Sequence, residues 1–215
     1  MGKLVIKAHE MVEFASNTTD KEIRQTVKEK TGFSVRRLDK VTLTSLYAVY
    51  RLIANNKTQE PLALYSGAEY MSIDLFQSVI VAMENKETIR PYDFIATVGN
   101  AANFYLSKEF NIHGPNIFIG ASNNILLKIG LLVETDLNLS HCQQAVIVIW
   151  NNSSKAHSCH ALLVEKSSIL ESNNKTAKIA DIGEINSKDL LTLLKESQYP
   201  LFLDLNYDFS LHYSR

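Results

Sequence analysis

The stretch that decides the fold runs from Asn100 to Trp150 and reads NAANFYLSKEFNIHGPNIFIGASNNILLKIGLLVETDLNLSHCQQAVIVIW. Its pattern predicts a helix, a Gly114-Pro115 turn, a short buried strand, a tight turn, a second apolar helix and a second buried strand. This order places the residues from Gly120 to Asn124 at an elbow between a strand and a helix. Such an elbow often presents a nucleophile, so the side chains found there decide what chemistry is open to the chain.

The remainder of the chain alternates predicted strands with predicted helices. We expect strands at Lys3–His9, Pro61–Tyr65, Gln144–Trp150, His160–Glu165 and Pro200–Leu205, and helices at Asp20–Lys30, Thr42–Asn55, Ile73–Glu84 and Asn186–Glu196. Loops are expected at Thr88–Phe94 and over residues 151–159 and 168–178. The alternation is typical of the α/β class. With no internal repeat or Pro/Gly-rich linker, we expect residues 1–215 to form a single domain with one mixed sheet covered by helices.

The composition is that of a folded protein with no preference for a charged partner. Hydrophobic residues make up 46% of the 215 residues, and the net charge is -1. Nucleic-acid binding needs a basic excess or stripe, and we interpret the small cluster of Arg36, Arg37 and Lys40 as a solvated loop. No run of about 18 apolar residues occurs, so we expect neither an export signal nor a membrane span.

Cysteines and histidines give little sign of metal or redox chemistry. Cys142 and Cys159 are too few for a disulfide framework, and we expect both to be buried thiols in a reducing, cytoplasmic setting. His157 and His160 have a spacing that suits a metal, but no third ligand lies near them in the sequence. We therefore expect no metal and no cofactor.

Ser122 at the elbow superficially suggests a serine hydrolase. The Gly-x-Ser-x-Gly elbow of those enzymes needs glycine on both sides of a strained turn, whereas the second position here is Asn124. Downstream, the sequence shows no clear Asp followed by His, apart from pairs such as Asp204 or Asp208 with His212 in the tail. The chain also lacks a Gly-Lys-Ser/Thr motif for phosphate. Pattern alone therefore predicts an α/β domain without an evident active site.

The central stretch resembles the N-terminal half of the β-ketoacyl synthases, which have the thiolase-like fold. The resemblance is carried by Asn100-Ala101-Ala102 at the start of a helix, the Gly114-Pro115-Asn116 turn, and the strands Ile117 to Gly120, Ala145 to Ile149 and His160 to Glu165. Counting from Gly114-Pro115, the family's nucleophilic cysteine falls on Asn123. The resemblance covers most of this chain but only half of the family, and nothing matches the second half with its two catalytic histidines.

Two further segments differ from the pattern of the family. The family's Gly-Gly-x-Glu is replaced by Trp150-Asn151-Asn152, and the Gly-rich lead into the last matched strand has become Ser158-Cys159-His160. Carbon-carbon bond formation needs a thiolate, which an asparagine amide cannot supply. The resemblance therefore implies a non-catalytic chain-length factor, similar to the truncated partners of ketosynthases in type II polyketide and aryl-polyene pigment systems.

This resemblance also implies a partner and a mechanism. The strand Ile117, Phe118, Ile119 and Gly120 is expected to pair across a pseudo-twofold with a full-length ketosynthase, and an acyl carrier protein is involved only indirectly. Side chains of this subunit would close the far end of the partner's acyl tunnel, and we expect Ala68, Phe94, Thr97, Asn100 and Phe104 to line it. Simple packing is the alternative for each, above all for Phe104 and Thr97.

Two other functions stay open. Some ketosynthase-like proteins with glutamine in place of the cysteine decarboxylate malonyl groups, although that activity uses the histidines of the missing half. A generic interaction module with no polyketide role is the third interpretation, and failure to bind any ketosynthase would distinguish it.

Overall fold

The computed structural model describes residues 3–68, 73–120, 124–152, 156–166, 179–181 and 201–204. Its strands are β1 (Lys3–Ala15), β2 (Leu62–Ala68), β3 (Asn116–Gly120), β4 (Gln144–Asn152), β5 (Ala156–Lys166), β6 (Ile179–Asp181) and β7 (Leu201–Asp204). Its helices are α1 (Asp20–Thr31), α2 (Lys40–Asn55), α3 (Ile73–Glu84), α4 (Pro91–Ala96), α5 (Ala101–Glu109) and α6 (Ile125–Asn138). Asn123, the loop over residues 168–178 and the predicted helix Asn186–Glu196 lie outside the described residues.

All the strands join one sheet in the order β3-β2-β4-β5-β1-β7-β6. Parallel pairing joins β2 to β3 and to β4, while β5 is antiparallel to both β4 and β1. The predicted α/β class with a single mixed sheet is confirmed. No helix within the described ranges is both long and apolar enough to cross a membrane.

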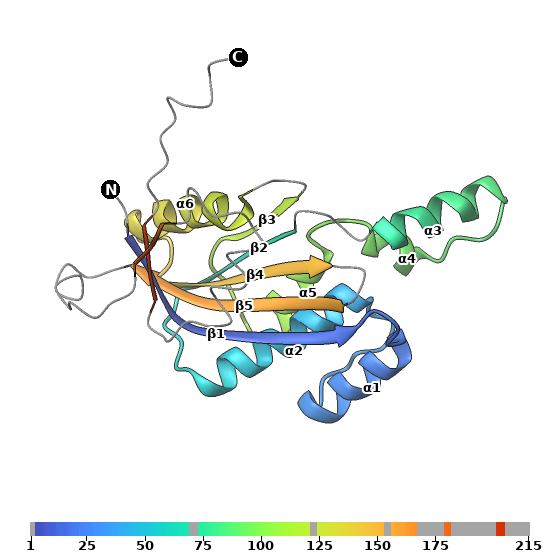
Figure 1. The fold of residues 1–215 in the computed structure, drawn as a ribbon, viewed down its shortest axis with the longest axis horizontal. Helices are drawn as coiled ribbons and strands as arrows, with labels where there is room; N and C mark the ends of the chain where they lie inside the picture. Colours follow the sequence, from blue (N-terminus) through green and yellow to red (C-terminus); the bar gives the residue numbers. More distant parts are fainter. Residues whose placement is uncertain are drawn as a thin grey trace, which may run out of the picture.

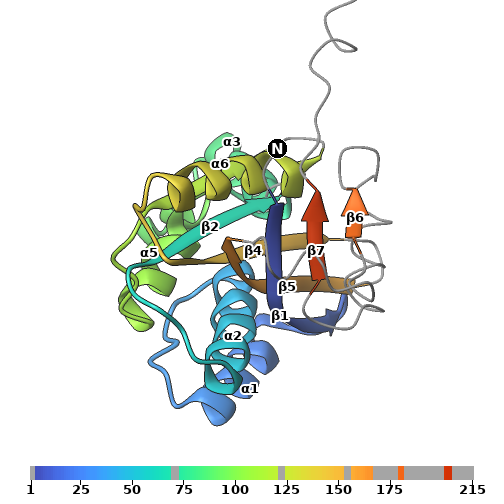
Figure 2. The same cartoon turned by 90° about the vertical axis from the view of Figure 1, so that its left-hand side faces the viewer.

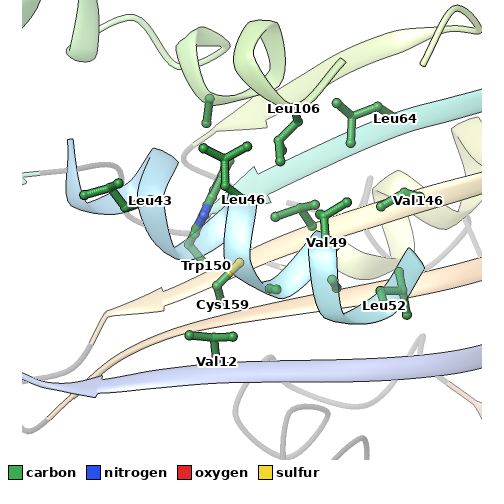
Figure 3. Packing of buried hydrophobic residues seen from close by; sticks show 14 of the residues in the cluster. Val12, Leu43, Leu46, Val49, Leu52, Leu64, Leu106, Val146, Trp150 and Cys159 are labelled. Carbon is green, nitrogen blue, oxygen red and sulfur yellow. The ribbon is translucent and has the colours of Figure 1, made fainter. Parts of the chain in front are cut away.

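Helices cover both faces of the sheet, so two hydrophobic cores form (Figures 1 and 2). On one face, Ile125, Ile129 and Val133 of α6 pack against the sheet. On the other face, α2 and α5 lie over the strands, and Leu46, Val49 and Leu52 of α2 share one buried cluster with residues of the sheet (Figure 3). Burial on both faces explains why β2 and β4 read as continuous apolar runs in the sequence.

The first two helices begin at side-chain caps. Thr19 accepts from the Glu22 N–H while the Glu22 carboxylate accepts from the Thr19 N–H, and Gly32 ends α1 at φ 75. The predicted boundaries of this helix are thus confirmed within a residue. Asp39 caps α2 by accepting from the Thr42 N–H at 3.0 Å. Helix α2 therefore begins at Lys40, before the predicted start, because Asp39 accepts from that first-turn N–H.

Strand β1 extends to Ala15, well beyond the predicted end at His9. Its pairing with β5 is irregular between Ile6 and Ala8. Leu4 and Ile6 lie in the core beneath α6, whereas Val12 lies in the core on the opposite face. A bulge inserts one residue and reverses the inward and outward alternation. This reversal hides the second half of the strand from a search for strict alternation.

Three further boundaries differ from the sequence prediction. Strand β2 starts at Leu62 and extends to Ala68, past the predicted Tyr65. The segment predicted as a loop at Thr88–Phe94 contains α4, in which Pro91 occupies the first helical turn, where its missing N–H costs nothing. The polar loop expected over residues 151–159 is largely strand, because β4 and β5 continue into it.

The Gly114-Pro115 turn fastens β3 to β2 through main-chain groups. Gly114 donates its N–H to the Leu62 carbonyl at 2.9 Å, and the Leu64 N–H donates to the Pro115 carbonyl at 2.8 Å. A Cβ at position 114 would lie 2.5 Å from the same Leu62 oxygen. Glycine is needed here for close backbone approach, which explains the turn motif seen in the sequence.

Replacing Gly114 with Ala should lower the free energy of unfolding by about 1–3 kcal/mol, because the added methyl group collides with main-chain atoms that cannot rotate away. Chemical denaturation measures the change. Gly32→Asn is the matched control, since asparagine tolerates the left-handed conformation and nothing lies within 4 Å of that position. Equal effects of the two substitutions would contradict this account of the turn.

Tyr65, at the centre of β2, is joined to α6 by a polar network. Its hydroxyl donates to Asp136 of α6, whose other carboxylate oxygen lies 2.8 Å from Nδ1 of His141. Partial burial acts to raise the pKa of Asp136, but the hydrogen bonds from Tyr65 and His141 outweigh it and hold that pKa below its usual value. Burial, together with the bond to Asp136, raises the pKa of Tyr65, so the hydroxyl remains a donor.

This network predicts a pH-dependent contribution to stability. Because the pKa of Asp136 is lowered in the folded state, its contribution is present above the ordinary value of 3.8 and is lost as pH falls through the folded-state pKa. Asp136→Asn should therefore cost about 1–3 kcal/mol at neutral pH. In urea unfolding, the difference from wild type should shrink below pH about 4. A difference that stays constant with pH would rule out this contribution.

Candidate functional site

The predicted elbow is described at its two ends, Gly120 at the end of β3 and Asn124 before the first residue of α6. Asn124 precedes the first residue of α6 in the left-handed conformation, with φ 54 and ψ 41, and its carbonyl accepts from the Lys128 N–H. Asparagine tolerates this conformation better than most residues. Its side chain makes no capping hydrogen bond to the helix. The assignment of Asn123 to the family's cysteine position stays a prediction, because residues 121–123 are outside the described part.

The first turn of α6 rests directly on the backbone of β2. A Cβ at Gly67 would lie 2.6 Å from Cγ1 of Ile125 and 3.0 Å from Cδ1 of Ile129. The absence of a side chain at Gly67 thus sets the distance between the helix and the sheet. This contact holds the elbow at the end of the parallel strands.

Both cysteines are buried, and their surroundings disfavour the thiolate form. The sequence contains two cysteines, and both are buried and free of disulfides. Burial raises the pKa of Cys142 to about 11, and burial, partly offset by a hydrogen bond to Ser45, raises the pKa of Cys159 to about 12. Both thiols are therefore protonated at neutral pH. The prediction of buried thiols is confirmed.

The two histidines considered as metal ligands both lie in β5: His160 was predicted in a strand, whereas His157 was expected in the loop before it. His160 is fully buried and its ring stacks on His9, with His160 Nδ1 and His9 Nε2 3.0 Å apart. Within the described ranges, no group of three or more His, Cys, Asp or Glu side chains has an arrangement that could hold a metal. The stacked pair contributes to the packing between β1 and β5.

Strand β3, the predicted dimer strand, lies at the end of the sheet order and pairs with β2. The hydrogen bond from Leu64 to Pro115 sets the register, so Ile117 and Ile119 direct their main-chain groups to β2. Main-chain groups of Asn116, Phe118 and Gly120 point away from β2. Such an edge is a template for another strand.

A large apolar surface lies next to this edge and was not predicted. Helices α3 and α4 extend away from the sheet (Figure 1). They and the turn after them expose the residues that we call the α3–α4 surface: Phe76, Ile80, Val81, Met83, Tyr92, Phe94, Ile95 and Val98. The predicted helix Ile73–Glu84 carries an apolar stripe of the kind that usually packs into a core, but its residues Phe76, Ile80 and Met83 are exposed. Val81 was the available signal, since it lies off the stripe and indicates a helix that is apolar on more than one side.

The predicted tunnel residues fall into two groups. Phe94 and Phe104 are 61% and 62% exposed, and Asn100 is also exposed, so these three belong to the outer surface beside α4 and α5. Thr97 is half-buried and donates its hydroxyl to the Phe94 carbonyl. Ala68 is buried at the end of β2, where it pairs with Gly120 and Trp150. Their role as tunnel lining stays a prediction.

A buried amide network holds α5 against the edge of the sheet. Asn103 is 1% exposed and accepts from the Ser66 hydroxyl of β2. Its Nδ2 donates to Oδ1 of Asn116 at 2.8 Å and to the carbonyl of Ile117 at 3.3 Å. Sequence reasoning missed Asn103, because its partners come from two distant strands.

The basic cluster is largely solvated, as predicted. Arg36 and Arg37 are exposed, and Arg37 lies 5.2 Å from the centroid of the Tyr92 ring. Lys40 instead begins α2 and lies 3.9 Å from Asp20. The contact between Arg37 and Tyr92 attaches the loop before α2 to the α3–α4 surface.

Comparison with known proteins finds solved structures of similar fold at low sequence identity. No protein-family model matches the sequence, and no curated protein matches it. Among solved structures, the ishigamide ketosynthase/chain length factor matches with TM-score 0.58 and 13% identity, over 77% of this chain and 63% of that chain. The chain thus spans less than two thirds of that neighbour.

A ketosynthase (ApeO) in complex with its chain length factor (ApeC) from Xenorhabdus doucetiae also matches with TM-score 0.58, at 12% identity. The chain has a ketosynthase-type fold. This match covers 91% of this chain and 93% of the matched one, so the two are of about the same length. The predicted thiolase-like architecture is thereby confirmed.

The amide network predicts how the edge strand is held. Asn103→Ala leaves the Ser66 hydroxyl and the Asn116 amide without this partner, which should cost about 1–3 kcal/mol. Amide hydrogen exchange at Ile117 and Ile119 should accelerate as β3 loosens. Asn138→Ala, at an exposed position at the end of α6, is the control and should change neither quantity. Unchanged exchange in Asn103→Ala would show that β3 is held without the network.

Proposed function

We propose that this chain is a non-catalytic chain-length factor. It forms a heterodimer with a full-length ketosynthase of a type II polyketide system, of the kind that makes aryl-polyene pigments. Its side chains close the far end of the acyl tunnel that begins at the partner's cysteine. An acyl carrier protein delivers substrate to the partner and meets this chain only indirectly.

The α3–α4 surface beside the β3 edge supports this role most strongly. Large contiguous apolar patches on a folded chain mark interaction sites. The outward main-chain groups of β3 are suited to pairing with a strand of a second subunit. In this proposal, burial of the exposed apolar residues supplies affinity, and strand pairing along β3 sets the register.

The state of the cysteines supports the non-catalytic part of the proposal. A condensing enzyme must carry its acyl group on a thiolate, and both thiols of this chain are buried and protonated. The chain therefore needs a partner with a reactive cysteine. Its likeness in fold and length to a chain in a ketosynthase complex with a chain length factor supports a partner of this kind.

Co-expression with a full-length ketosynthase of a type II polyketide system tests the proposal directly. We expect a stable heterodimer on size-exclusion chromatography, and condensation products that depend on both subunits. A chain that stays monomeric in the presence of this partner would overturn the proposal and favour a generic interaction module. Malonyl decarboxylation by the isolated chain would favour the decarboxylase function instead.

One substitution should disrupt the heterodimer without unfolding the chain. Ile80 is 53% exposed on α3. Ile80→Asp should weaken the complex by about tenfold or more. The free-energy cost of burying an unpaired carboxylate exceeds the ~1.4 kcal/mol that corresponds to a tenfold change in affinity. Analytical ultracentrifugation measures the affinity.

Leu139→Asp provides the matched control. Leu139 is 60% exposed just after the end of α6, away from α3 and α4. This variant should bind the ketosynthase like wild type, and both variants should keep the wild-type circular dichroism spectrum. Equal binding by Ile80→Asp and wild type would place the interface elsewhere.

A further inference from the structure

Arg37 has a backbone conformation that arginine rarely adopts, with a φ of 65° in the left-handed region. It is the third residue of a turn in which the Leu38 N–H donates to the Val35 carbonyl at 3.5 Å. A positive φ at the third position of such a turn is usually supplied by glycine or asparagine, because a longer side chain is strained there. The presence of arginine is therefore explained by its side-chain contacts rather than by its backbone.

The turn that carries Arg37 is fixed to the body of the protein. Val35 and Leu38 are both buried in the core on the face covered by α2 and α5. The Leu38 carbonyl also accepts from Nη2 of Arg24 in α1 at 3.0 Å. Arg36 and Arg37 are exposed between these two anchors. The Arg37 side chain therefore starts from a fixed point on the surface.

Helix α4 lacks two kinds of contact that usually hold a short helix in place. None of its six residues, all within the described part of the chain, is buried, and Arg90 at its start makes no side-chain capping hydrogen bond. Helix α4 packs on α3 and on α5, while α3 and α4 extend away from the sheet (Figure 1). Burial within α4 therefore cannot fix the position of the α3–α4 surface, so contacts on the outside of the helix contribute more.

The side chain of Arg37 connects the fixed turn to this helix. Its guanidinium carbon lies 5.2 Å from the centroid of the Tyr92 ring, and Tyr92 is the second residue of α4. A guanidinium over an aromatic ring within about 6 Å of its centroid forms a cation–π contact. Tyr92 is 43% exposed and belongs to the α3–α4 surface. The contact therefore joins the turn before α2 to the edge of that surface.

We propose that the contact between Arg37 and Tyr92 is a latch that holds the α3–α4 surface in the position in which it meets its partner. The effect on assembly rests on the proposed heterodimer with a ketosynthase, whereas the latch itself is a property of this chain alone. Affinity falls with the fraction of chains whose surface is in the binding position, so a surface held there in advance binds more tightly. Arg37 is thus a positioning residue, and its side-chain contact offsets the strain of its backbone.

Arg37→Asn should loosen the α3–α4 surface without unfolding the chain. Asparagine tolerates a positive φ, so the free energy of unfolding should stay close to that of wild type. Amide hydrogen exchange in α3 and α4 of the full chain should accelerate about two- to fivefold, the range that an exposed cation–π contact contributes, while exchange in β2 and β4 stays the same. Arg36→Asn is the matched control, because it removes the same charge from an adjacent exposed residue that has no positive φ, and it should change neither quantity.

Variants of Tyr92 test the aromatic partner. Tyr92→Phe keeps the ring and should behave like wild type, whereas Tyr92→Leu removes the ring and should match Arg37→Asn. The double variant should loosen the surface no further than either single substitution, because both remove the same contact. In the heterodimer with a full-length ketosynthase, analytical ultracentrifugation should show about two- to fivefold weaker binding by Arg37→Asn than by wild type.

The outcomes separate the latch from the proposed function. Unchanged exchange in α3 and α4 of Arg37→Asn, or an equal acceleration in Arg36→Asn, would overturn the latch. Exchange that accelerates throughout the sheet would also overturn it, because it would show a loss of overall stability. Faster local exchange with unchanged affinity for the ketosynthase would overturn the role of the latch in assembly. Failure of the wild-type chain to bind the ketosynthase would overturn the proposed function, while the exchange measurement would still decide whether the latch exists.

Discussion

The structure depends on the parallel pairing of the buried strand β2 with β3 and β4. Residues along β2 also hold the neighbouring turn and helices in place. Leu62 and Leu64 bond the Gly114-Pro115 turn, Tyr65 bonds the C-terminal part of α6, and Ser66 bonds α5 through Asn103. Gly67 then allows the first turn of α6 to rest on the strand. A main-chain ladder with polar contacts at both ends fixes the elbow, the edge strand and the helix between them as one unit.

This unit belongs to the ketosynthase-type fold, and the sequence has no cysteine between Gly120 and Asn124. The elbow is present, with Asn124 in the left-handed conformation at the start of α6. Both thiols are protonated and buried on the sheet faces. What the scaffold keeps is the edge of β3 and the apolar surface beside it. In the proposed heterodimer, binding and the shape of the tunnel wall would take the place of chemistry.

Sequence reasoning succeeded where local chemistry determines structure. The capping box of Thr19 and Glu22 marks α1, the continuous apolar runs mark β2 and β4, and the Gly114-Pro115 turn marks the start of β3. The sequence prediction failed where the structure departs from strict strand alternation or from the usual extended conformation around proline. A bulge beyond Ile6 reversed the alternation of β1, and Pro91, expected to hold the chain extended, instead begins α4.

By itself the sequence determined the α/β class, the order of the central elements and the absence of a cysteine at the elbow, because periodicity and residue identity are properties of the chain. Only the tertiary structure decided that the apolar stripe of α3 is exposed, that Asn103 is buried among polar partners, and that Phe118 lies on Gly99. Each depends on contacts between residues far apart in the sequence. The same apolar residue can face a core or a partner, and only the packing of the other elements settles which.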